Sequence, residues 1–289
     1  KLQRQLDYHV TQKNWTQALI IAERIPEENY TIFTCHDVNR ALYENGRLLS
    51  DMFTYQQHYS SLLLNSPAAK KGLYLSKRYL KLSAIYFELG DINRSEQFCH
   101  EAHELIGYAP ELLERLVKIN ILKGYEQAAR VFANSLTADP LYKNCGQKFL
   151  RQIDKGPQEE LKHHLKKIKA RMYKKEPETP TLFPPKDLFN VNPSNRMAFE
   201  YLMGFCLLTG QIEPVVKSVK YLDGLNYPEG KIPKLIQQAI LLYTQITKRR
   251  AELCGRKIEL AEINRMNAFG KKIQAYLNVD RGKALKALE

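Results

Sequence analysis

Apolar residues recur three and four positions apart through most of the chain, which is the spacing of one buried face of an α-helix. Residues 79–106 show this pattern best and predict two helices, Tyr79–Leu89 and Ile92–Ile106, joined at Gly90-Asp91. Their apolar positions are Leu82, Ile85, Tyr86 and Leu89, then Phe98, Ala102 and Leu105. No segment alternates apolar and polar residues over the length of a strand. The pattern therefore predicts an all-α protein without a sheet.

A short turn motif recurs along the first half of the chain. A polar or glycine turn is followed by a large apolar residue and usually by a small residue three positions later, as in Trp15-Thr-Gln-Ala18 and Tyr125-Glu-Gln-Ala128. Related forms occur at Gly46–Asp51 and Gly90–Ser95. This motif resembles the turn between the two helices of a tetratricopeptide (TPR) repeat. The resemblance implies a TPR-like α-α superhelix of helical hairpins.

The spacing of these turns is close to one repeat. Ala18 and Asp51 are 33 positions apart, as are Ser95 and Ala128, against an ideal of about 34. Asp51 and Ser95 are 44 positions apart, which places about ten additional residues in the segment 58–73. The repeats are divergent in sequence. We expect about four TPR-like hairpins within residues 1–150.

Three further segments follow the predicted repeats. Residues 151–176 are strongly basic and predict an amphipathic helix, with Leu161, Leu165 and Ile168 on its apolar side. Residues 177–194 are rich in proline, which is incompatible with a helix interior, and predict a linker or a wrapping loop. Residues 195–289 predict further helical hairpins, packed on the first block, with Ser194 as the first N-cap.

The order of several short segments resembles an uncharacterised family of Bacteroidetes membrane proteins. The matching segments are Trp15–Ala18, Gly46–Phe53, Ile85–Gly90, Leu113–Asn120 and Asn195–Leu202, followed by Ile232-Pro233. Members look like several N-terminal membrane helices followed by a soluble TPR-like domain, and no function is assigned to them. The resemblance implies a membrane segment upstream of Lys1. It also implies a location at the cell envelope, where we favour the periplasmic over the cytoplasmic side.

The positive charge belongs to the second half of the chain. The 289 residues carry a formal net charge of +13, but residues 1–150 hold 18 basic and 16 acidic side chains, against 26 and 15 in residues 151–289. A basic surface attracts nucleic acid, anionic lipid or an acidic protein without selecting among them. A solvated face without a ligand is the simpler interpretation. The basic-face candidates are Lys162, Lys166, Lys169, Lys248 and Arg249.

The sequence contains no recognisable catalytic, cofactor or metal signature. The five cysteines form no Cys-x-x-Cys pair, and neither a phosphate-binding loop nor a Gly-x-Ser-x-Gly motif occurs. His100 and His103 lie on one side of a predicted helix, but no further ligands accompany them. We therefore expect no enzymatic activity, cofactor or metal in this chain.

The repeat register indicates which side chains line a concave surface. In stacked hairpins one helix of each pair faces the groove. The groove candidates are then Arg40, Tyr43, Phe87 and Asn120, a mixture of polar and aromatic groups that suits a peptide. Packing inside the protein is the equal alternative for some of them. The Lys and Asn pattern with which one TPR subclass binds a C-terminal carboxylate is missing.

Three hypotheses for function remain at this stage. The first is a protein-interaction or scaffold domain that binds a protein or peptide. The second is a nucleic-acid-binding helical array that uses the basic second half, which we regard as less favoured because the aromatic residues lie at core spacing. The third is a regulatory domain of a membrane enzyme whose active site lies upstream of this chain.

Overall fold

The computed structural model describes residues 1–64, 73–175 and 181–286. Within these ranges the chain forms fifteen α-helices and no β-strand, as the hydrophobic pattern predicted. None of the helices in the described ranges is both long enough and apolar enough to cross a lipid bilayer.

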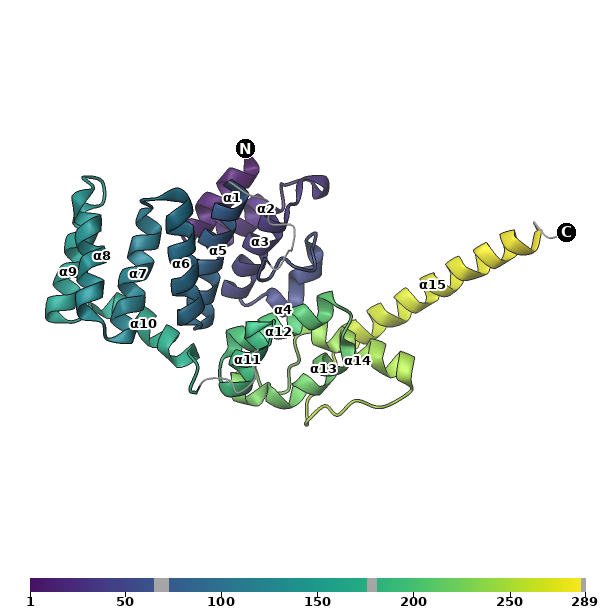
Figure 1. Ribbon diagram of the computed structural model, residues 1–289. Coiled ribbons are helices and arrows are strands. Elements are labelled where there is room, and N and C mark those ends of the chain that lie inside the picture. The colour runs from purple at the N-terminus through teal and green to yellow at the C-terminus, as the bar shows by residue number, and fades with distance from the viewer. Residues whose placement is uncertain (65–72, 176–180, 287–289) are drawn as a thin grey trace.

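Helices α1 to α3 and α5 to α9 lie side by side in a row, and the short helix α4 packs against α3 (Figure 1). Short turns join α1 to α2, α3 to α4, α5 to α6 and α7 to α8, and α5 packs on α6, α7 on α8 and α8 on α9. Their bounds are α1 Leu2–Thr11, α2 Trp15–Ala22, α3 Ile32–Glu44, α4 Leu48–Asp51, α5 Leu73–Leu89, α6 Ile92–Ile106, α7 Pro110–Lys123, α8 Glu126–Ala138 and α9 Lys143–Lys155.

Local sequence signals set several of these helix ends. The side chains of Thr31 and Asp91 accept hydrogen bonds from the backbone amides of Thr34 and Arg94, each at 3.2 Å, and so cap the N-termini of α3 and α6. At the other end of α7, Gly124 adopts the left-handed conformation that closes a helix C-terminus. These local interactions fix where α3 and α6 begin and where α7 ends.

The remaining helices form a second group below the row (Figure 1). Helix α10 contacts α5 and α7, and both α12 and α14 contact α4. The last helix, α15, projects away from the rest of the molecule (Figure 1). The bounds are α10 Glu159–Arg171, α11 Pro184–Val191, α12 Arg196–Leu208, α13 Ile212–Lys217, α14 Lys234–Thr247 and α15 Leu260–Lys286.

The structure departs from the sequence prediction between residues 151 and 195. The basic segment 151–176 is not one helix, because α9 runs to Lys155 and Gly156, with φ at +86°, and Pro157 separate it from α10. The segment 177–194 contains α11, since two prolines are tolerated in a first turn, where no amide hydrogen is needed. Residues 176–180 lie outside the described residues.

The N-cap of α12 also differs from the prediction. Asn195, and not Ser194, accepts the hydrogen bond from the Ala198 amide, at 3.0 Å. The Ser194 hydroxyl donates instead to the Asn192 side chain, at 2.7 Å. Both residue types are good caps, so composition alone did not distinguish the two neighbours.

Two apolar clusters form the interior. The larger cluster joins residues of α1 to α5 with residues of α11 to α14, and it includes Leu42, Leu48, Phe199 and Tyr201. The smaller cluster lies among α5 to α10. The second group of helices therefore completes the core of the first group rather than forming an independent body.

Three residues hold α10 and α12 against the turn between α5 and α6. The buried Arg171 guanidinium donates to the backbone carbonyl of Glu88 at 2.6 Å. The Asn195 side-chain amide donates to the carbonyls of Leu89 at 2.9 Å and Arg171 at 2.8 Å. Gly90 makes this approach possible, because a β-carbon there would lie 2.6 Å from the carbonyl carbon of Arg171.

Replacing Gly90 tests this junction. We expect Gly90→Ala to lower the free energy of unfolding by about 2–5 kcal/mol, because the methyl group meets backbone and φ at this position is +92°. The matched control is Gly124→Ala, where φ is +77° but no atom lies within 4 Å of the added carbon. It should cost about 1–2 kcal/mol in urea unfolding. Equal losses in the two variants would show that the close approach of Arg171 contributes nothing.

Candidate functional site

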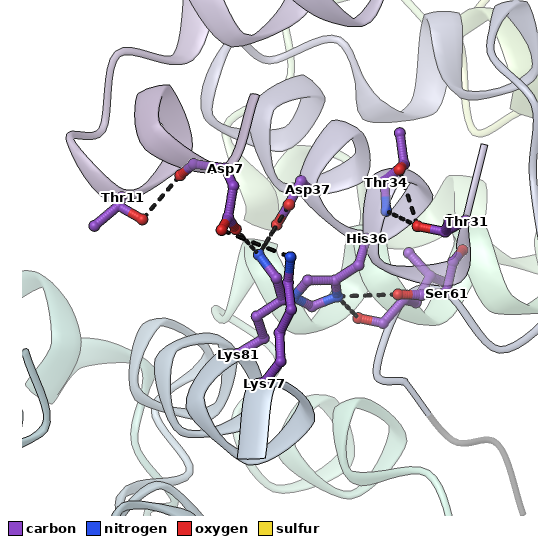
Figure 2. A network of polar contacts seen from close by, with 10 residues as sticks. Asp7, Thr11, Thr31, Thr34, His36, Asp37, Ser61, Lys77 and Lys81 are labelled. Atoms are coloured by element: carbon purple, nitrogen blue, oxygen red, sulfur yellow. Dashed lines mark hydrogen bonds and ion pairs between the residues drawn. The ribbon is translucent and has the colours of Figure 1, made fainter. Parts of the chain in front are cut away.

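The ammonium group of Lys81 joins three helices of the row (Figure 2). It lies 2.6 Å from Asp7 Oδ1 on α1, and 2.7 and 2.8 Å from the two carboxylate oxygens of Asp37 on α3. The Lys81 and Asp37 side chains are 8% and 4% exposed. Lys77, one turn earlier on α5, adds a weaker contact to Asp7 at 3.6 Å. The three N–H donors of Lys81 are thus matched by three carboxylate oxygens.

His36, beside Asp37 on α3, joins the Lys81 cluster to the chain that follows α4 (Figure 2). Its Nδ1 lies 3.0 and 3.1 Å from the backbone carbonyls of Ser61 and Leu62, so Nδ1 carries the hydrogen and donates to them. Burial holds the pKa of His36 well below its ordinary value of 6.5, and the nearby cations Arg40 and Lys81 lower it further. His36 is therefore neutral at physiological pH.

A cavity of about 260 Å³ lies next to the Lys81 cluster, and Asp7, Lys77 and Lys81 belong to its lining. It is bounded by α1, α3, α5 and α7, which are alternate helices of the row, and by α10. We call this cavity the groove. Its lining residues are Asp7, Val10, Thr11, Lys13, Arg40, Lys77, Leu80, Lys81, Ala84, Phe87, Glu88, Glu111, Glu114, Arg115, Lys118 and His164.

Most of the charges in the groove are paired with one another. Besides the Lys81 cluster, Lys13 lies 3.4 Å from Glu88, and Lys118 lies 3.5 Å from Glu114. Six cationic side chains line the groove against four carboxylates, with Asp37 as a fifth carboxylate behind Lys81. The groove therefore carries a small positive excess on a surface that also contains apolar side chains.

Glu88 is the most perturbed of these carboxylates. Burial acts to raise its pKa, but Lys13, His164, Arg40 and Arg171 outweigh that effect and hold the pKa of Glu88 at about 2. Across from it, burial lowers the pKa of His164 to about 4, against the opposing influence of Glu88. At neutral pH the groove thus presents an ionised Glu88 beside an uncharged imidazole.

Two of the four predicted groove residues line the groove. Arg40 is 9% exposed and its guanidinium lies 5.6 Å from the centre of the Trp15 ring, while Phe87 is 4% exposed and packs near His164. Tyr43 faces the second group of helices instead, where its hydroxyl accepts a hydrogen bond from Arg171 at 3.0 Å. Asn120 is buried and donates to the Leu116 carbonyl of its own helix at 2.8 Å.

The five predicted basic-face residues are all exposed but lie in two separate parts of the structure. Lys162, Lys166 and Lys169 lie on α10, and Lys162 is 3.1 Å from Glu159. Lys248 and Arg249 follow the end of α14. None of the five lines the groove.

Sequence reasoning missed the Lys81 cluster, Glu88 and His164. Asp7, Asp37 and Lys81 are far apart in sequence and meet only because their helices are neighbours in the row. One local signal exists, because Asp37 and Arg40 are charged residues within a helix whose other positions are mostly buried. Charged residues are rarely buried without partners, so such positions mark either a buried ion pair or a ligand site.

A second cavity, of about 570 Å³, lies between α4, α12 and α14. Its buried polar residues include Glu200, which accepts hydrogen bonds from Tyr227 at 2.7 Å and Arg196 at 2.8 Å. The Arg196 guanidinium also lies 4.1 Å from the centre of the Tyr227 ring. These three groups therefore satisfy one another.

The described part of the chain contains no group of three His, Cys, Asp or Glu side chains arranged to hold a metal ion. The whole chain belongs to a family of unknown function, DUF6057, whose profile matches residues 1–287. No curated protein and no solved structure matches the chain.

Removal of the Lys81 ammonium tests the buried cluster. We expect Lys81→Met to lower the free energy of unfolding by about 3–5 kcal/mol, because the buried Asp37 carboxylate loses its cation. Lys77→Met, on the same helix, removes a 40% exposed partner of Asp7 and should cost less than about 1 kcal/mol. Urea unfolding at pH 7 measures both variants. A loss in Lys81→Met no greater than in Lys77→Met would contradict the assigned role.

Acid should destabilise the protein through His36. Its pKa is lower in the folded than in the unfolded chain, so the unfolded chain binds the proton first as the pH falls below about 6.5. The stabilisation is complete above that pH and decreases by up to about 1.4 kcal/mol for each pH unit below it. His164 adds to the loss between 6.5 and about 4.

The variant that isolates this effect is His36→Asn, whose amide nitrogen can replace Nδ1 as the donor but does not titrate. We expect its unfolding free energy to vary less between pH 7 and pH 5 than that of the unmodified protein. His103→Asn, at an exposed position on α6, is the matched control and should keep the original slope. An unchanged slope in His36→Asn would refute this explanation.

Proposed function

We propose that this chain is a non-enzymatic protein-interaction domain whose groove binds a segment of a partner protein. The observation that supports the proposal is the shared cavity of α1, α3, α5 and α7, because each of these helices is the first of a consecutive pair. Stacked helical pairs with one helix of each on the inside are the arrangement of TPR-like repeats. The TPR-like architecture is part of the same proposal.

The lining of the groove suits a peptide better than a compact small molecule. Leu80 and Ala84 are partly exposed apolar residues of the groove, Val10 and Phe87 expose only small edges, and charged side chains lie among them. An extended or helical segment can place its apolar side chains against the first set and its polar side chains against the second. A location at the cell envelope is a separate proposal that rests on the family resemblance alone.

The experiment uses the whole chain, immobilised and exposed to a random library of peptides. We expect a set of bound peptides that is lost in Ala84→Trp, which places an indole in the groove at a half-exposed helix position. Ala138→Trp, at an exposed position on α8 outside the groove, is the matched control and should retain the set.

Two results would refute the proposal. The first is the absence of any peptide that distinguishes the unmodified protein from Ala84→Trp. The second is salt-dependent binding of RNA or DNA that Lys162→Gln and Lys166→Gln weaken while no peptide is captured. That second result would favour the basic face of α10 as the binding surface.

A further inference from the structure

Within the described ranges Arg115 and Arg40 are the groove cations without an anionic partner, but Arg115 donates to the Ser83 hydroxyl at 2.7 Å, which leaves Arg40. Its side chain lines the cavity and the residue is only 9% exposed. Within the described ranges it takes part in no hydrogen bond or ion pair, and its one specific contact is with the face of the Trp15 ring. A guanidinium has five N–H donors, and the nitrogens of Arg40 are reached by solvent from the cavity but have no protein acceptor in the described ranges.

The neighbouring carboxylates are engaged elsewhere. Asp7 and Asp37 are held by Lys81, and Glu88 lies between Lys13 at 3.4 Å and Arg171 at 3.9 Å. Arg40 is close enough to Glu88 to lower its pKa, but it makes no hydrogen bond with it. The pairing of the other charges therefore leaves Arg40 available to an incoming anion.

We propose that the Arg40 guanidinium binds a side-chain carboxylate of an acidic segment of the partner protein, an inference that rests on the proposed function. A carboxylate matches the planar fork of a guanidinium with two parallel hydrogen bonds. The Trp15 ring behind Arg40 limits where the fork can point. Leu80 and Ala84 on α5 provide apolar contacts for the residues on either side of the acid.

The test uses three libraries of nine-residue peptides with blocked ends, in which the central residue is Glu, Gln or Lys and the others are random. Blocked ends exclude recognition of a terminal carboxylate. We expect the unmodified protein to retain Glu-centred peptides roughly ten- to a hundredfold better than Gln-centred ones at 0.15 M salt. Lys-centred peptides should bind most weakly.

The variant Arg40→Met should abolish this preference, and its urea midpoint shows whether the variant is folded. Arg40→Lys keeps the charge without the fork, and we expect it to reduce the preference. Arg4→Met removes the same charge from an exposed position on α1 outside the groove, and should behave like the unmodified protein.

The possible outcomes separate this inference from the function on which it rests. The role of Arg40 is overturned if the protein retains peptides that Ala84→Trp loses but shows no preference for Glu. It is also overturned if Arg40→Met keeps that preference. In both cases the groove remains supported as the peptide-binding site. If no library is retained, the role of Arg40 and the proposed peptide-binding function are both refuted. If Arg40→Met does not fold, Arg40→Lys decides, and an undiminished preference in that folded variant overturns the inference.

Discussion

The Lys81 ammonium fixes the relative positions of α1, α3 and α5, and the shape of the groove depends on it. Apolar contacts between helices tolerate small shifts, because many side-chain arrangements bury a similar area. An ammonium group enclosed by three carboxylate oxygens at 2.6–2.8 Å tolerates much less, since a shift leaves a buried charge unpaired. The floor of the groove is therefore formed before any ligand arrives.

The second group of helices supports the same surface from behind. Arg171 joins α10 to Tyr43 on α3 and to the end of α5, while Asn195 joins α12 to the same turn. Helix α10 then brings His164 to the rim of the groove. This explains why Tyr43, expected in the groove, lies in an internal contact: the row of helices is covered on that side by chain that the repeat register does not include.

The sequence predicted the elements that depend on local signals. The helix Ile92–Ile106 is confirmed at both ends, because Asp91 caps its start and a glycine with positive φ follows its end. The all-α class is likewise confirmed. Helix α11 was missed because proline density was taken to exclude a helix, although prolines are compatible with a first turn. The break at Gly156-Pro157 was not predicted, because residues 151–176 were interpreted as one continuous helix.

The site was only partly predictable because its chemistry depends on contacts between distant residues. The repeat register placed Arg40 and Phe87 at the groove, since each lies on the first helix of a pair. It gave no information on which cations find partners: Lys81 is saturated by carboxylates 44 and 74 positions away, while Arg40 has none. That difference arises from the packing of the helices and distinguishes a structural cation from one that is available to a ligand.

The most direct test of the central claim is hydrogen–deuterium exchange of the whole chain with and without a peptide that it retains. If the groove is the binding site, the peptide should slow exchange in α1, α3, α5 and α7 and leave the exposed faces of α10 and α14 unchanged. Slower exchange confined to α10 and the end of α14, with the four groove helices unaffected, would contradict the account.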